Sequence, residues 1–167
     1  MRSKRELRNF SVSDTIVITK AEKNGHENLI RELEAIESKC FSDPWSTQAF
    51  KDTIENPASD IYIAKNASLK NTVGFCAVMH ATDEAEILDI AVDPEMRRHG
   101  IGKKLLTYSI TELKKAGIIT VFLEVRVSNC PAINLYEKFG FNKIGIRRGY
   151  YRTPVEDAIL MKYSIKI

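Results

Sequence analysis

Residues 97–104, with the sequence RRHGIGKK, constrain the fold of this chain more than any other segment. They stand between an apolar run that ends at Asp93 and Pro94 and an amphipathic stretch that continues to Gly117. Gly100 and Gly102 allow a tight turn and a close backbone approach to a ligand, because neither carries a Cβ. A helix that begins at such a turn presents unpaired N–H groups and the positive end of its dipole. The segment therefore predicts a strand, a phosphate-binding turn and a helix in succession.

The cationic side chains around the two glycines support an anion as the ligand of this turn. The Gly-Lys-Ser/Thr ending of a P-loop is missing, and so are the three glycines of the dinucleotide fingerprint. Taken alone, the same residues also fit a strand-to-helix turn with a solvated basic rim. The residues alone leave both interpretations open.

The length and composition of the chain predict one ordinary globular domain. At 167 residues it can bury a single core, and it is 44% hydrophobic and 28% charged. We expect this domain to cover residues 15–167 and residues 1–14 to form a flexible basic arm, which is either a solvated tail or a contact to RNA. The net charge of +3 is too small to indicate nucleic acid as the main partner. No run resembles a signal peptide or a membrane span, which predicts a cytoplasmic protein.

The chain has three cysteines, Cys40, Cys76 and Cys130, an odd number with no close pair in sequence. We therefore expect them to be reduced, buried structural thiols. The three histidines are scattered along the chain. Neither residue type has the spacing of a metal site, and we expect no metal. Nothing in the composition argues against a monomer or a weak homodimer.

Hydrophobic periodicity predicts an α/β fold, a mixed sheet with helices on both faces. The expected order is strand, helix, helix, three strands, helix, strand, helix and two strands. Ser46 is placed to cap the second helix, and Gly117 to end the third. The first strand begins near Thr15, and strands at 61–64 and 73–79 form a hairpin across a polar turn. A third strand follows at 86–92.

The second half of the chain is predicted to hold the core strand. Residues 118–127 are rich in β-branched side chains and apolar on both faces at the start, which is typical of a central strand covered on both sides. A helix from Cys130 is expected to close at Gly140. Two last strands are expected at 141–146 and 157–163, with a polar and aromatic loop at 147–154 between them.

Two side chains in this half are candidates for acid–base chemistry. Glu124 lies inside the expected central strand, where desolvation disfavours a charged carboxylate, the tuning that a general base near pH 7 needs. The alternative is an ion pair with Arg126, which lies on the same face of the strand. Tyr136 lies on the apolar face of the next helix and is either core or functional.

These residues together resemble the GCN5-related N-acetyltransferase (GNAT) superfamily from Ile87 to Tyr163. Its pyrophosphate loop, Arg/Gln-x-x-Gly-x-Gly/Ala, is met by Arg97, Gly100 and Gly102. Further segments are similar to protein N-terminal acetyltransferases, both the bacterial branch that acts on a ribosomal protein at alanine and the archaeal branch. They are LEVRVSN at 123–129, AINLYE at 132–137, GYY at 149–151, EDA at 156–158 and DPWS at 43–46. Asp43 stands where the bacterial branch has phenylalanine, while VSN at 127–129 is closer to the archaeal branch. The similarity covers residues 40–163.

The resemblance implies the GNAT fold, acetyl-CoA as co-substrate, and a gap in the sheet that holds the pantetheine arm. The gap is expected where the end of the 86–92 strand and the start of the 118–127 strand splay apart. The implied cofactor-binding residues are Ile90, Ala91, Val92, Arg97, Arg98, His99, Gly100, Ile101, Gly102, Lys103 and Asn129. Among them, the Val92 amide is expected to polarise the thioester carbonyl. Asn129 also suits helix capping.

The resemblance also implies roles on the acceptor side. Glu124 is the implied general base, through a water, and Tyr136 the implied general acid that protonates the leaving thiolate. Trp45, Tyr150 and Tyr151 are expected to flank the acceptor entrance, unless they merely cover the sheet edge. The expected acceptor is a protein or peptide N-terminus. A lysine or small-molecule amine is an alternative acceptor, and a non-catalytic CoA-binding or ribosome-interaction module is an alternative of another class.

Overall fold

The computed structural model describes residues 15–166, so the expected N-terminal arm lies outside the described residues. The observed order of elements is the predicted one. In chain order they are β1 (Ile16–Lys20), α1 (Glu27–Cys40), α2 (Thr47–Glu55), β2 (Ser59–Asn66), β3 (Asn71–Ala81), β4 (Glu84–Val92), the short 3-10 helix η2 (Pro94–Met96), α3 (Ile101–Lys115), β5 (Thr120–Arg126), α4 (Cys130–Phe139), β6 (Asn142–Arg152) and β7 (Val155–Ser164).

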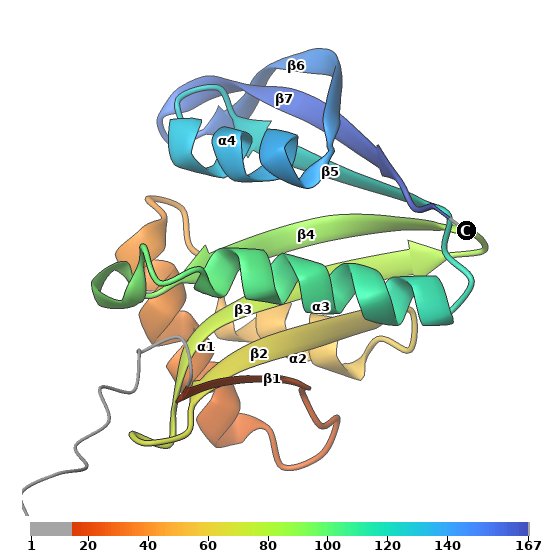
Figure 1. Cartoon of the computed structure of the whole chain (residues 1–167). Coiled ribbons are helices and arrows are strands. Elements are labelled where there is room, and N and C mark those ends of the chain that lie inside the picture. Colours follow the sequence, from red (N-terminus) through yellow and green to blue (C-terminus); the bar gives the residue numbers. More distant parts are fainter. Residues whose placement is uncertain (1–14, 167) are drawn as a thin grey trace, which may run out of the picture.

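The strands form one seven-stranded sheet in the order β1-β2-β3-β4-β5-β7-β6. Only β4 and β5 run parallel, and the other neighbours are antiparallel. Helices α1 and α2 lie behind the sheet in Figure 1, and α3 and α4 lie in front of it. The prediction of a mixed sheet with helices on both faces is confirmed.

Each face of the sheet has its own core. Leu105, Leu113 and Leu123 belong to the core under α3 and α4, which extends to Tyr136 on α4. Phe50 and Phe75 belong to the core under α1 and α2. The predicted caps are also present, because Ser46 Oγ accepts the Ala49 amide at 3.2 Å and Gly117 follows α3 with a φ of +87°.

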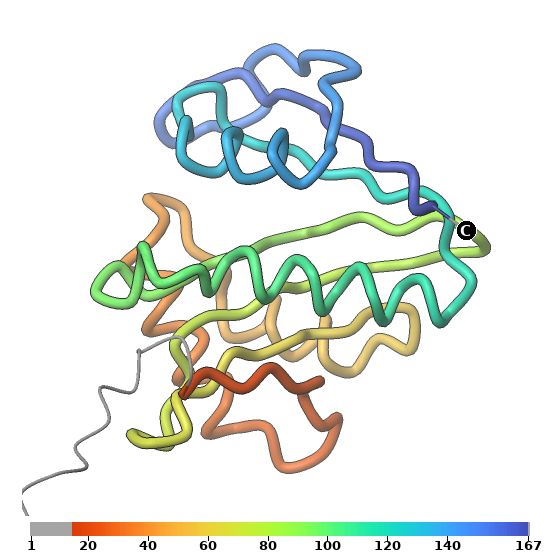
Figure 2. Tube along the Cα trace, viewed as in Figure 1, coloured from red at the N-terminus to blue at the C-terminus, as the bar shows by residue number. Residues whose placement is uncertain are grey.

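The parallel strands β4 and β5 pair only over their first residues, from Glu84 with Thr120 to Ile87 with Leu123. Beyond this point β4 carries an extra residue, Leu88, because Ala77 of β3 pairs with Asp89 and Val78 with Ile87. Such a bulge bends its strand. Figure 2 shows β4 and β5 close together near the C-terminal end of the chain and separating away from it.

The predicted position of the gap was therefore wrong for one strand. The start of β5 is paired, and it is the second half of each strand that separates. Parallel strands that pair at their beginnings can diverge only toward their ends.

Two further expectations need correction. Val121, Leu123 and Val125 of β5 are buried, whereas on the other face only Thr120 is buried and the later residues are partly exposed, so β5 is not covered equally on both sides. The expected loop at 147–154 is mostly strand, since β6 continues to Arg152 and only Thr153 and Pro154 make the turn. A bulge between Arg147 and Tyr151 interrupts the pairing there and disguises the strand period.

Candidate active site

The turn before α3 has the backbone that an anion site needs. Arg98 and Gly100 have left-handed φ angles of +68° and +73°. Gly100 occupies the N-cap position of α3, so the amides of the first helical turn, from Ile101 to Lys103, have no partner within the helix. Successive N–H groups in such a conformation form a concave anion site. A Cβ on Gly102 would lie 3.3 Å from Leu135 Cδ2, which fits the close approach of α3 and α4 here.

The side chains of the predicted phosphate-binding residues differ in where they point. Arg98, His99 and Lys103 are exposed, whereas Ile101 is 1% exposed and offers a ligand only its backbone. Arg97 turns back to the end of β4, where its Nε donates to the Val92 carbonyl at 3.2 Å and a terminal nitrogen lies 3.3 Å from Cys40 Sγ. Arg97 therefore anchors the turn to the strand.

The backbone of β4 faces the gap at alternate residues. The Asp93 amide donates to the Val73 carbonyl on β3 at 2.9 Å. Since the N–H groups of successive residues in a strand point to opposite sides, the Val92 and Ile90 amides point away from β3, toward the gap. Burial raises the pKa of Asp89, and the Ile90 backbone lies close enough to its carboxyl to oppose that larger effect in part. The Ala91 side chain packs in the core under α1 and α2.

Glu124 lies on β5 one residue beyond the last pair with β4, at the point where the gap opens. Its side chain is 8% exposed, and its Oε1 lies 2.9 Å from Arg147 Nε. The alternative ion pair with Arg126 does not form. Arg126 instead lies 3.2 Å from the carboxylate of Glu156 and donates to the carbonyls of Thr153 and Pro154.

Tyr136 approaches the gap from the opposite face of the sheet. It is 4% exposed and packs on Phe141, with 5.8 Å between the ring centroids. Burial raises the pKa of Tyr136, and the nearby charges of Cys76 and Asp89 raise it further. The phenol therefore stays protonated, the form from which a general acid starts. Asn129 caps α4, accepting the Ala132 amide at 3.3 Å, which leaves its side-chain nitrogen to donate to a ligand.

The residues expected at the acceptor entrance come from two segments that touch each other. Ser42 Oγ, in the connection between α1 and α2, donates to the Thr153 carbonyl in the β6–β7 turn at 2.6 Å. Trp45, in the first of these segments, packs on Phe50 of α2. Tyr150 and Tyr151 meet edge to face in the second, with centroids 5.1 Å apart. Burial raises the pKa of Tyr151 to about 12.

A pair of carboxyl groups between α1 and β4, one buried and one half-buried, was missed by the sequence reasoning. Glu37 on α1 is 1% exposed and accepts the Trp45 amide at 3.1 Å, and its carboxyl group lies beside that of the half-buried Asp89 on β4. Burial raises the pKa of both side chains, and their mutual repulsion raises that of Asp89 further. Both carboxyls therefore keep a proton to higher pH than exposed carboxyls do. An acidic residue on the apolar face of α1, beside Leu33 and Ile36, was the available signal.

The prediction of three buried thiols holds for one cysteine. Cys76 is buried, but Cys40 is half-buried and Cys130 is exposed at the start of α4, so the expectation of three buried thiols was wrong. Between residues 15 and 166, no three His, Cys, Asp or Glu side chains are grouped so that they could hold a metal ion. No helix in that range is long and apolar enough to cross a membrane.

Comparison with known proteins identifies the family. The model of the acetyltransferase (GNAT) family matches residues 30–141. The [ribosomal protein bS18]-alanine N-acetyltransferase of Escherichia coli K12 is 40% identical over 134 residues, which cover 79% of this chain and 88% of that protein.

Solved structures agree with this match. The crystal structure of the ribosomal-protein-S18-alanine N-acetyltransferase from Escherichia coli superposes with a TM-score of 0.81 and 34% identity, covering 91% of this chain and 95% of that one. Arabidopsis thaliana NAA60 in complex with acetyl-CoA shares the fold, with a TM-score of 0.78 and 20% identity over 90% of this chain and 99% of that one. The predicted GNAT fold is confirmed, and the chain belongs to the GNAT family of N-acetyltransferases.

Proposed function

We propose that this enzyme transfers the acetyl group of acetyl-CoA to the N-terminal α-amine of a protein, with a ribosomal protein as the acceptor. The relative that is 40% identical over most of the chain carries that activity in its name. A ribosomal acceptor places the reaction in the cytoplasm. Acetyl-CoA itself would occupy the gap between β4 and β5, with its pyrophosphate on the turn at 97–103.

The groups around the gap fit the binding of an acyl-CoA. The amides of the first turn of α3 suit a pyrophosphate, and the exposed cations Arg98 and Lys103 add charge of the right sign. The amides of Ile90 and Val92 point toward the gap, where an extended pantetheine arm could pair with β4 like an added strand. Asn129 would add a side-chain donor to that arm.

The transfer itself needs one proton acceptor and one proton donor. The amine nitrogen forms a bond to the acetyl carbon, and the bond between that carbon and sulfur breaks. Glu124 would accept the proton that the nitrogen loses, through a water, and Tyr136 would donate one to the departing thiolate. The Val92 amide would stabilise the negative charge that develops on the carbonyl oxygen. Glu124 and Tyr136 reach the gap from opposite faces of the sheet, so the thioester would lie between them.

The chemistry of the amine favours an α-amine over lysine. With an ordinary pKa near 7.8, about a tenth of α-amines are neutral at pH 7, against on the order of 0.04% for lysine near 10.4. A single carboxylate base is then sufficient. The observation that carries the choice is the contact of Ser42 with Thr153, which joins the two segments flanking the entrance. An entrance bordered by two joined segments suits the N-terminus of a peptide better than a lysine side chain in the middle of one.

The test compares two peptides with the same sequence. One has a free N-terminus and no lysine, and the other has a blocked N-terminus and one lysine. After incubation with labelled acetyl-CoA, mass spectrometry locates the acetyl group. Faster acetylation of the free N-terminus supports the proposal, and equal rates on the two peptides contradict it.

A further inference from the structure

The proposed base, Glu124, is covered by two side chains of β6. Arg147 Nε lies 2.9 Å from its Oε1, and the Tyr150 hydroxyl hydrogen-bonds to the same carboxylate. That hydrogen bond, together with burial and the charge of Glu124, raises the pKa of Tyr150 to about 12. The side chain of Glu124 is 8% exposed and that of Arg147 is 56% exposed. The guanidinium therefore lies between the buried carboxylate and solvent.

The bulge in β6 is what allows both side chains to reach Glu124. Residues three apart in a regular strand point to opposite faces of the sheet. Here the pairing shifts between Arg147 and Tyr151, so that the intervening residues lie opposite Asp157. The Gly149 amide donates to Asp157 Oδ1 at 2.7 Å, and Gly149 has a φ of +57°. This local geometry brings Tyr150 to the same face as Arg147, where their cation and ring lie 5.7 Å apart.

A second carboxylate shares the same guanidinium. Burial and the charge of Glu124 raise the pKa of Glu86 on β4, while Arg147 lowers it. Two other cations on this face, within residues 15–166, are held elsewhere. Lys162 on β7 lies over the Phe122 ring at 5.7 Å, and Arg126 is bound to Glu156. Arg147 is thus the cation that faces both Glu86 and Glu124.

From this arrangement we infer that Arg147 is the resting counter-ion of Glu124 and that the α-ammonium of the acceptor replaces it when the peptide binds. The inference rests on the proposed function, because it assigns the place of the acceptor amine. Arg147 makes and breaks no covalent bond, so it is a positioning residue. It places a positive charge beside the buried carboxylate while the site is empty. Its half-exposed side chain can swing into solvent, and Glu86 provides a second partner for the displaced charge.

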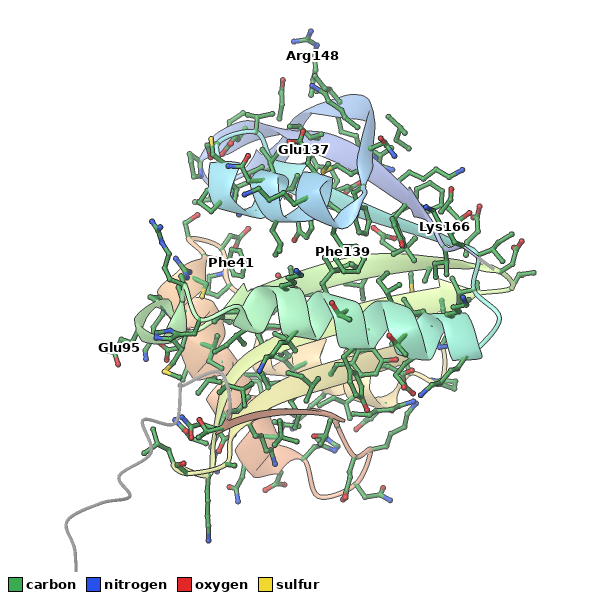
Figure 3. All side chains as sticks on the ribbon, in the orientation of Figure 1. Phe41, Glu95, Glu137, Phe139, Arg148 and Lys166 are labelled. Atoms are coloured by element: carbon green, nitrogen blue, oxygen red, sulfur yellow. The ribbon has the colours of Figure 1, made fainter. Side chains whose placement is uncertain are left out.

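The experiment uses Arg147→Gln, with Arg148→Gln as the matched control. Arg148 is the next residue, but its side chain is 90% exposed and 3.9 Å from Asp157, and Figure 3 shows it pointing away from the molecule. The rate constant kcat/KM is measured against pH with a peptide that has a free N-terminus. Binding of that peptide and of its N-acetylated form to the CoA-loaded enzyme is measured by calorimetry.

The expected result has two parts. Arg147→Gln lowers the dissociation constant of the free-amine peptide about two- to fivefold, the range in which a half-exposed ion pair contributes, because the ammonium no longer competes with the guanidinium. It also moves the acidic limb of the kcat/KM profile upward by about half a pH unit, since a carboxylate that loses a neighbouring cation is protonated more easily. In Arg147→Lys, which keeps the charge, the acidic limb of the kcat/KM profile stays near its wild-type position. Arg148→Gln changes neither quantity.

Three outcomes would overturn the inference: an unmoved acidic limb in Arg147→Gln, weaker binding of the free-amine peptide, or an equal gain for the N-acetylated peptide. The first excludes a counter-ion, the second makes Arg147 a contact to the acceptor, and the third excludes competition with the ammonium. Failure of the proposed function is distinct. If the wild-type enzyme acetylates only lysine side chains, that function is wrong, while a moved limb with a lysine acceptor would still support Arg147 as the counter-ion.

Discussion

At the scale of single residues, the candidate site depends on side chains that meet across the sheet. Glu124 projects from one face of β5, and Tyr136 reaches the gap from α4 on the other face. Neither could serve the same thioester if β4 and β5 stayed paired along their whole length. The proposed roles of both residues therefore depend on the gap, and measurements of turnover test them.

Glu124→Gln and Tyr136→Phe should each slow turnover by about 10²–10⁴-fold, the usual contribution of a general base or acid. Both substitutions keep the shape of the side chain, so the dissociation constant of acetyl-CoA should change little. Steady-state kinetics and calorimetry provide the two measurements. If a folded variant turns over at the wild-type rate, the substituted residue has a structural role and no catalytic one.

The raised pKa values of Glu37 and Asp89 predict how stability depends on pH. Burial raises the pKa of both carboxyls, so the native state holds a proton that the unfolded chain releases above about pH 4. The contribution of the pair to the free energy of unfolding is therefore largest at low pH and falls as pH rises from about 4 through the raised pKa. Asp89→Asn removes the fall in the free energy of unfolding at higher pH, because asparagine does not ionise, and it supplies an N–H donor to Glu37.

We expect Asp89→Asn to raise the free energy of unfolding by about 1 kcal/mol at pH 7.5, the size of one hydrogen bond, with a smaller gain at pH 4.5. Urea denaturation at the two pH values measures both. The control is Asp83→Asn, whose side chain is exposed in the turn before β4. A gain that is the same at both pH values would contradict the raised pKa values of the pair.

At the scale of elements, the proposed function gives different substrates to the turn before α3 and to the β6–β7 hairpin. In that proposal the backbone amides of the turn bind the pyrophosphate, and Tyr150 and Tyr151 on the hairpin flank the acceptor entrance. Because they belong to separate elements, damage to one should leave binding at the other nearly intact. Two substitutions with matched controls test this separation.

Gly100→Val should abolish measurable binding of acetyl-CoA. A valine at a φ of +73° is strained, and the turn would lose the conformation that presents its amides. Gly25→Val is the control, because Gly25 has a φ of +67° and equally open space around its Cβ, yet lies before α1, outside the proposed site. Calorimetry with acetyl-CoA compares the two. Equal affinity in both variants would show that the turn does not bind the cofactor.

Arg126→Met should raise the KM for the acceptor peptide on the order of tenfold, about the loss of one hydrogen bond to a charged group. Arg126 bonds to the β6–β7 turn and lies 4.1 Å from the centroid of the Tyr151 ring, so its removal loosens the hairpin. The dissociation constant of acetyl-CoA should not change. Arg152→Met, an exposed neighbour in β6, is the control. An unchanged KM in Arg126→Met would show that the hairpin does not position the acceptor.

At the scale of the whole molecule, the sheet is held together across the gap by a short parallel pairing. Four residue pairs join β4 to β5, whereas β5 and β7 pair along seven. A ligand that lies in the gap and touches both sides would add contacts that only the folded protein can make. It should therefore stabilise the fold by mass action.

Acetyl-CoA at about 100 times its dissociation constant should add about 2.7 kcal/mol to the free energy of unfolding. For a domain of this size, the Tm then rises by roughly 5–10 °C. CoA should act in the same way, since the pyrophosphate and pantetheine are common to both. Differential scanning fluorimetry measures the shift. The absence of any shift with either ligand at millimolar concentration would contradict a CoA site in the gap.

The sequence by itself determined the order of the elements, the caps and the glycine turn before α3, because these depend on neighbours in the chain. Hydrophobic period, Ser46, Gly100 and Gly117 are local signals of this kind. Tertiary structure decided what depends on partners distant in sequence. The gap involves a bulge at Leu88 and the pairing of strands 36 residues apart in sequence (Glu84 with Thr120). Glu124 on β5 meets Arg147 on β6 across the intervening strand β7, and Glu37 on α1 meets Asp89 on β4. No local pattern encodes such contacts, since only packing of the sheet brings these charges together.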